Sequence, residues 1–198
     1  MAPQGTDTDH EARRGELLEV VRERGLIHFE EPRELSSGEM SHDFVDGKRA
    51  LAAGRHLRLA CQVMAESVGA AGIAFDAVGG LTLGADQFAH GVAAWLDDDT
   101  EWFVVRKKPK GRGTDQLVEG AELGADKRVF LVDDAVTTGG SIQKAFHHVT
   151  DTGATVVAAS TLIDRGDVAA RFFEEHGVPY LPVFTYRDLG IAPVAGGS

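Results

Sequence analysis

The 198-residue chain has one cysteine, Cys61, and only two tryptophans and two tyrosines. A single cysteine cannot form an internal disulfide framework, and this is typical of proteins in a reducing compartment. No stretch approaches the roughly 18 apolar residues that a membrane-spanning helix needs. Residues 1–16 are acidic and lack an apolar segment, so no secretory or transit signal is visible. We therefore expect a cytoplasmic protein without a membrane partner.

Positive charge is also scarce. The chain has 20 Lys and Arg against 31 Asp and Glu, which gives a net charge of -11 and argues against a nucleic-acid partner. An anionic substrate would have to be received by a local basic cluster. The metal, nucleotide and nucleophile motifs Cys-x-x-Cys, His-Glu-x-x-His, Walker A and Gly-x-Ser-x-Gly are missing. The length suits one domain over residues 1–198, with residues 1–8 and 191–198 as flexible tails.

The most informative stretch runs from Val129 to Ser141, VFLVDDAVTTGGS. Its four apolar residues indicate a buried strand, Asp133 and Asp134 follow them, and the small residues after Thr137 can open a helix. Small residues at a helix amino end let backbone N–H groups bind an anion, and carboxylates accept hydrogen bonds from hydroxyl groups. The pattern fits a ribose phosphate, although an ordinary strand-to-helix turn has similar residues.

This stretch closely resembles the 5-phosphoribosyl 1-pyrophosphate (PRPP) binding motif of type I phosphoribosyltransferases. The resemblance implies that Asp133 and Asp134 (the acid pair) hold the ribose hydroxyls as catalytic residues. It also implies magnesium as the cofactor, with no residue assigned as its ligand. The 5-phosphate would bind to the phosphate loop, which consists of Thr137, Thr138, Gly139, Gly140 and Ser141.

Two other segments resemble the orotate phosphoribosyltransferases of this family. In ELSSGEMSHDFVDGKRAL, Phe44 falls on an aromatic position, whereas Val45 replaces a second aromatic and Ser36 replaces a substrate-binding Lys of some relatives. Farther along, a predicted strand ends in an Asp-Arg pair. The resemblance implies that Phe44, Thr137 and Arg165 bind orotate. A planar, permanently charged guanidinium suits its carboxylate.

The leaving pyrophosphate corresponds to two further segments. A Gly-Gly-x-Thr-x-Gly turn places Thr82 in a pyrophosphate loop, with Leu83 where some relatives have Lys. A basic stretch then follows a third strand, as the mobile catalytic loop does in the family. The resemblance makes Lys110 catalytic and assigns PRPP binding to Arg106, Lys107 and Arg112. Arg112 replaces the common His, so a titrating proton donor is lost there.

These elements predict an α/β fold, with a mostly parallel central sheet flanked by helices and a small N-terminal hood. The implied function is transfer of the phosphoribosyl group of PRPP to orotate, in a homodimer whose catalytic loop is shared between subunits. Two alternatives stay open: a phosphoribosyltransferase for another base, and a PRPP-sensing regulator without catalysis.

Overall fold

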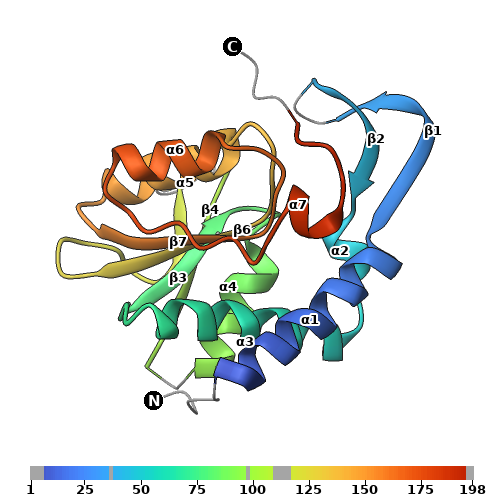
Figure 1. Ribbon diagram of the computed structural model, residues 1–198. Coiled ribbons are helices and arrows are strands. Elements are labelled where there is room, and N and C mark those ends of the chain that lie inside the picture. The colour runs from blue at the N-terminus through green and yellow to red at the C-terminus, as the bar shows by residue number, and fades with distance from the viewer. Residues whose placement is uncertain (1–6, 36–37, 97–98, 109–116, 195–198) are drawn as a thin grey trace.

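The apolar run of the acid-pair stretch forms the centre of a six-stranded sheet in a computed structural model, which describes residues 7–35, 38–96, 99–108 and 117–194 (Figure 1). The strand order is β5-β4-β3-β6-β7-β8, and every neighbouring pair is parallel except β4 and β5. The predicted mostly parallel sheet is confirmed. Its strands are β3 (Ala77–Leu81), β4 (Glu101–Val105), β5 (Val118–Gly120), β6 (Arg128–Val136), β7 (Thr155–Asp164) and β8 (Phe184–Thr185).

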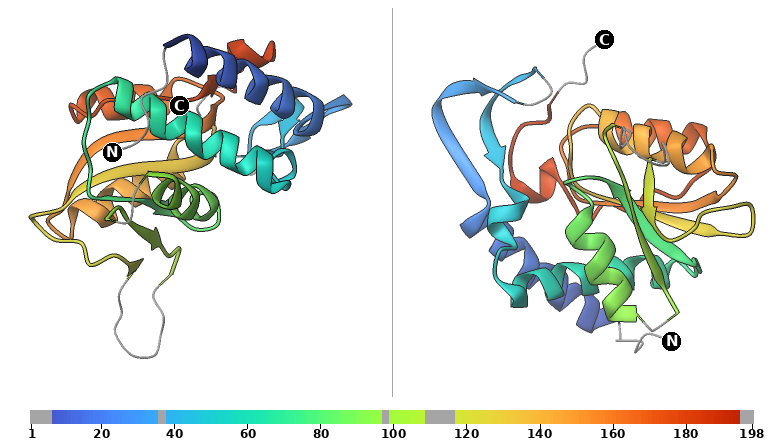
Figure 2. Two further views of the ribbon diagram at one scale, coloured as in Figure 1. Left: turned by 90° about the horizontal axis from the view of Figure 1, so that it is seen from below. Right: turned by 180° about the vertical axis from the view of Figure 1, so that it is seen from behind.

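Helices cover both faces of this sheet, as Figures 1 and 2 show. Along β6, Val129 and Leu131 pack into the core beneath α5 (Gly140–Thr150) and α6 (Val168–Glu175). The alternate residues Phe130 and Val132 belong to the core on the opposite face, with α1, α3 and α4. Burial on both faces explains why the strand is continuously apolar rather than alternating. The helices of the second face are α1 (Asp7–Arg24), α3 (Gly54–Ala70) and α4 (Asp86–Leu96).

The helical spacing of Leu57, Cys61, Met64 and Val68 predicts one helix from Arg49 to Val68. The structure has two helices there, α2 (Gly47–Ala50) and α3. Ala53 is extended, with φ −80° and ψ 131°, so the chain changes direction before α3 begins at Gly54. Sequence periodicity did not predict this break, because the alanines around it suit a helix equally well. The break separates the short α2 from the stripe of α3 that packs in the core.

The predicted N-terminal hood is an antiparallel hairpin of β1 (Leu26–Glu34) and β2 (Met40–Val45). It projects away from the central sheet in all three views (Figures 1 and 2). Near the C-terminus, the apolar stretch VPYLPVFTY predicts a last strand over residues 178–186, and this prediction was wrong. This segment has a single bridge at Tyr180 and the two-residue β8, followed by α7 (Tyr186–Leu189). Two prolines in the segment remove backbone donors from any longer strand pairing.

Residues 191–194, which the sequence placed in a flexible tail, pack against the end of β7. Val194 is 5% exposed, and its backbone N–H donates to the Arg165 carbonyl oxygen at 2.7 Å. Among the helices that the structure describes, none is both long and apolar enough to cross a membrane.

Candidate active site

The acid pair lies inside β6 rather than after its end. Ladder pairing continues past the apolar run, with Asp133 opposite Thr161 and Val136 opposite Asp164 of β7. Asp133 is 3% exposed, and its Oδ1 accepts a hydrogen bond from the Asp134 backbone N–H at 2.9 Å. The Oδ1 of Asp134 accepts one from the Ala135 N–H at 2.8 Å. Both carboxylates are therefore held by the backbone of the strand that carries them.

The environment of the acid pair opposes the ionisation of both carboxyl groups at once. Burial, and then the charge of Asp134, raises the pKa of Asp133 to about 7, although the Asp134 N–H and Lys48 act in the opposite direction. A ligand that donates hydrogen bonds to these oxygens would favour the ionised form. This property suits a site that binds hydroxyl groups.

Lys48 of α2 forms an ion pair with Asp134, from a position far away in the sequence. The sequence analysis missed this residue, because no motif or periodicity distinguishes it from the other surface lysines of an acidic protein. Only the fold brings α2 against β6.

The predicted pyrophosphate turn packs directly against the acid pair. A Cβ built on Gly84 would lie 2.2 Å from Asp133 Oδ1 and 2.8 Å from Asp134 Oδ1, so no side chain fits there. The Thr82 hydroxyl donates to Asp86 Oδ2 at 3.0 Å, which ties the turn to the start of α4. The glycine spacing in the sequence is thus explained by this close approach of backbone to carboxylates.

The phosphate loop joins β6 to α5 and lines a cavity of about 230 Å³, together with Asp133 and Lys144. Gly139 has φ 76°, a left-handed conformation that favours glycine, and it is the N-cap of α5. Backbone N–H groups at a helix N-terminus favour an anion. All five predicted loop residues therefore lie where a phosphate beside the acid pair could bind.

Basic residues lie beside the pyrophosphate turn. A cavity of about 470 Å³ brings Thr82 and Leu83 together with Arg106 and Lys107. Arg106 Nη1 lies 3.0 Å from Glu119 Oε1, and this ion pair holds the start of the basic segment, at Arg106, against β5. The predicted residues Lys110 and Arg112 lie outside the described part of the chain.

Arg165, predicted to bind the base, contacts the protein itself. Its side chain is 2% exposed, and its Nη1 donates to the Asp43 carbonyl oxygen at 2.7 Å. Its Nη2 donates to Ser41 Oγ at 3.2 Å, and burial lowers its pKa. Nε is buried with no hydrogen-bond partner in the residues that the structure describes. Arg165 therefore links the hood to the end of β7, and its Nε–H can donate to a further acceptor.

Phe44 is 40% exposed on β2. Successive side chains alternate along a strand, so the side chain of Phe44 lies on the face of β2 opposite to that of Ser41, whose hydroxyl contacts Arg165. Base binding by Phe44 and Arg165 stays a prediction.

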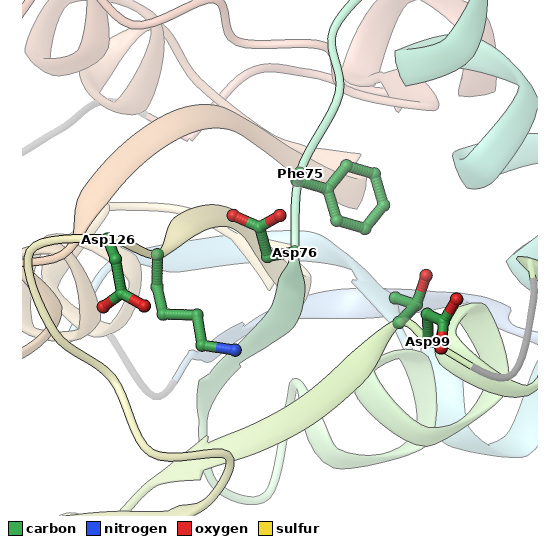
Figure 3. A pocket seen from close by; sticks show the side chains of 6 residues that line it. Phe75, Asp76, Asp99 and Asp126 are labelled. Atoms are coloured by element: carbon green, nitrogen blue, oxygen red, sulfur yellow. The ribbon is translucent and has the colours of Figure 1, made fainter.

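A separate cavity of about 310 Å³ lies near the amino ends of β3, β4 and β6, the opposite sheet edge from the acid pair (Figure 3). Asp76, Asp99 and Asp126 line it, and Lys127 in its wall pairs with Glu101. Its acidic lining does not suit an anionic substrate, so the candidate active site is at the other edge.

Comparisons with known proteins agree with this geometry. Residues 49–171 match the family described as Phosphoribosyl transferase domain. Orotate phosphoribosyltransferase of Mycobacterium tuberculosis is 38% identical over 178 residues, covering 90% of this chain and 97% of the relative. The chain belongs to the orotate phosphoribosyltransferase family. The enzyme of that name from Streptomyces coelicolor is also 38% identical, over 182 residues, with the same coverages.

Solved structures of the family share the fold. A crystal structure of M. tuberculosis orotate phosphoribosyltransferase in complex with Fe(III) dicitrate has a TM-score of 0.78, covering 90% of this chain and 99% of that one at 38% identity. The same enzyme in complex with PRPP has a TM-score of 0.75 at 36% identity, with the same coverages. The predicted type I phosphoribosyltransferase fold is confirmed.

Proposed function

We propose that this orotate phosphoribosyltransferase family member transfers the phosphoribosyl group of PRPP to orotate. The products are orotidine monophosphate and pyrophosphate. A ring nitrogen of orotate forms the new bond to the anomeric carbon of the ribose. The bond from that carbon to the pyrophosphate oxygen breaks with its electron pair going to the oxygen, and the proton of the ring nitrogen passes to the departing pyrophosphate. The observation that carries the proposal is the meeting of three elements at one sheet edge: the acid pair, the phosphate loop and the Gly84 turn.

The acid pair is proposed to orient the ribose. Asp133 and Asp134 are held by backbone N–H groups, so their free lone pairs can accept hydrogen bonds from the two ribose hydroxyls without rearrangement. Positive charge builds on the ribose ring as pyrophosphate leaves, and nearby carboxylates stabilise it. Preorganised electrostatic groups of this kind each contribute about 3–4 kcal/mol to transition-state stabilisation.

The leaving pyrophosphate is proposed to bind between the predicted pyrophosphate turn, which contains Thr82 and Gly84, and the basic segment that begins at Arg106. Arg106 and Lys107 line the same cavity as this turn, where they would neutralise the developing charge of pyrophosphate. The roles of Lys110 and Arg112 in this step rest on the family resemblance.

The residues present fit a magnesium ion that arrives with its substrate. Among the described residues, no group of three or more His, Cys, Asp or Glu side chains could hold a metal ion. Magnesium commonly binds through one or two carboxylates, water and substrate phosphates. Asp133 and Asp134 would hold it in this way, and bound magnesium would supply charge neutralisation to the diphosphate.

Base recognition is proposed at the hood. Among the described residues, the buried Nε of Arg165 has no hydrogen-bond partner, and this N–H suits the carboxylate of orotate. Thr137 begins the phosphate loop directly after the neighbouring strand β6. Phe44 would contact the base from β2. Because Val45, Leu83 and Arg112 depart from the common orotate pattern, transfer to another base is the alternative that most needs testing.

A steady-state assay with PRPP, magnesium and orotate, uracil or adenine tests the proposal. We expect kcat/KM for orotate to exceed that for uracil by at least about thirtyfold, because a buried cation left without its anionic partner costs about 2–5 kcal/mol. The matched control carries Asp133→Asn and Asp134→Asn, which should abolish turnover while leaving the fold intact. Equal use of uracil and orotate would refute the base assignment. PRPP binding without turnover of any base would favour the regulator.

A homodimer belongs to the same proposal and rests on the family resemblance. In it, the basic loop of one subunit would complete the site of the other.

A further inference from the structure

Lys48 supplies positive charge to the most negative part of the candidate site. Asp133 and Asp134 are adjacent in the chain, and Asp133 is almost fully buried. Repulsion between neighbouring carboxylates is strong where water is excluded. Ribose hydroxyls are neutral, and a magnesium ion would arrive only with the substrate, so the protein itself has to balance the charge of the pair before PRPP binds. Within the described ranges, Lys48 is the cation in contact with the pair.

The backbone of α2 is fixed firmly enough to direct this lysine. The Asp46 Oδ1 accepts a hydrogen bond from the Arg49 N–H at 2.9 Å, and the Asp46 N–H donates to the Gly25 carbonyl oxygen at 2.9 Å. A Cβ on Gly47 would lie 3.4 Å from Leu162 Cδ2 and 3.9 Å from Asp134 Cβ, so this part of α2 packs directly on β6 and β7. Lys48 follows immediately, so its stem starts at the acid pair.

The exposure of the two partners indicates what the contact does. The Asp134 side chain is 20% exposed and that of Lys48 is 49% exposed. A half-exposed ion pair contributes little to global stability. Asp134 Oδ1 is held by a backbone N–H and Oδ2 by Lys48, so the lysine completes the orientation of this carboxylate. Each oxygen still has a lone pair for a ribose hydroxyl.

We infer that Lys48 is a positioning residue of the PRPP site, which orients Asp134 and balances the charge of the acid pair so that the pair binds the ribose hydroxyls. The inference rests on the proposed function, because it assigns the ribose of PRPP to these carboxylates. It also links the chain segment that carries the hood to ribose binding, since β2 leads directly into α2.

The test measures binding by calorimetry for three variants of α2. Lys48→Met keeps the length of the side chain but removes its charge, and we expect the dissociation constant of PRPP to rise about five- to tenfold. Lys48→Arg should restore affinity to within about twofold, because a cation of similar reach remains. Arg49→Met removes the same charge from the next residue, which is exposed, and should bind PRPP as the unmutated protein does.

Calorimetry with ribose 5-phosphate and with inorganic pyrophosphate shows whether Lys48 acts through Asp134. If it does, Lys48→Met raises the dissociation constant of ribose 5-phosphate by a factor similar to that for PRPP, and it leaves the dissociation constant of inorganic pyrophosphate unchanged. An effect on pyrophosphate alone would mean direct contact with the leaving group and would overturn the inference. An equal loss in Arg49→Met would overturn it too, since the effect would then reflect net charge.

The two proposals fail in different ways. Unchanged PRPP affinity in Lys48→Met, in an enzyme that uses orotate, would reject the role of Lys48 alone. A protein that does not use orotate, but whose PRPP and ribose 5-phosphate binding depends on Lys48, would reject the proposed base and retain the positioning role.

Discussion

At the scale of single residues, Gly84 shows most directly how backbone packing shapes the candidate site. Its missing side chain leaves the space that the carboxylates of Asp133 and Asp134 occupy. Its φ is outside the left-handed region, so alanine is excluded there by contact and not by backbone conformation.

Replacing Gly84 by Ala should therefore weaken PRPP binding by at least about tenfold, because the new methyl group would displace both carboxylates from their backbone hydrogen bonds. Calorimetry with PRPP measures the effect, and thermal unfolding should show a native fold. Gly69→Ala in α3 is the matched control, since a Cβ there meets nothing within 4 Å. A Gly84→Ala protein that binds PRPP normally would show that the acid pair is not the ribose site.

At the scale of elements, the contact between α3 and α4 is set by a glycine and a cysteine. A Cβ on Gly91 of α4 would lie 2.3 Å from the Sγ of Cys61 in α3. Cys61 is 1% exposed and burial raises its pKa to about 12, so the thiol is an inert part of the core. These two small residues let the helices approach closely beneath β3 and β6.

Gly91→Ala should lower the free energy of unfolding by about 1–3 kcal/mol, because overpacking in a full core outweighs the better helix propensity of alanine. Urea unfolding at pH 7 measures the change. Cys61→Ala removes the clashing sulfur, so the double variant should be more stable than Gly91→Ala alone, a non-additive result that residues in contact produce. A Gly91→Ala protein as stable as the unmutated one would contradict the close packing.

At the scale of the whole molecule, the proposed shared loop predicts complementation between inactive subunits. Lys110→Ala and Asp134→Asn should each inactivate the proposed homodimer. A mixed dimer has one site with an intact acid pair and an intact Lys110 from its neighbour. Random pairing makes about half of the dimers mixed, so activity should recover to roughly a quarter of the unmutated level.

Subunit exchange is verified by native mass spectrometry of differently tagged chains. If Lys110 serves its own subunit, each site of a mixed dimer keeps one defect. Exchange without recovered activity would then rule out the shared loop.

What the sequence by itself determined lies in contiguous stretches. The apolar run, the acid pair and the phosphate loop lie within thirteen neighbouring residues from Val129 to Ser141, and their order on strand, turn and helix follows from covalent connection. The apolar run predicted a buried strand, and the structure buries it on both faces. The family resemblance used the same local patterns and was confirmed.

Only the tertiary structure decided which distant groups meet. Lys48 reaches Asp134 across 86 positions, and Arg165 joins Ser41 across 124. Neither contact has a sequence signature. Nothing distinguishes Lys48 from the other surface lysines, and the Asp-Arg pair that singled out Arg165 does not indicate Ser41 as its partner. The break after α2 and the short α7 were missed for a related reason. Local propensity at the break favours a helix and does not indicate one over α7, so packing against the rest of the protein selects the conformation.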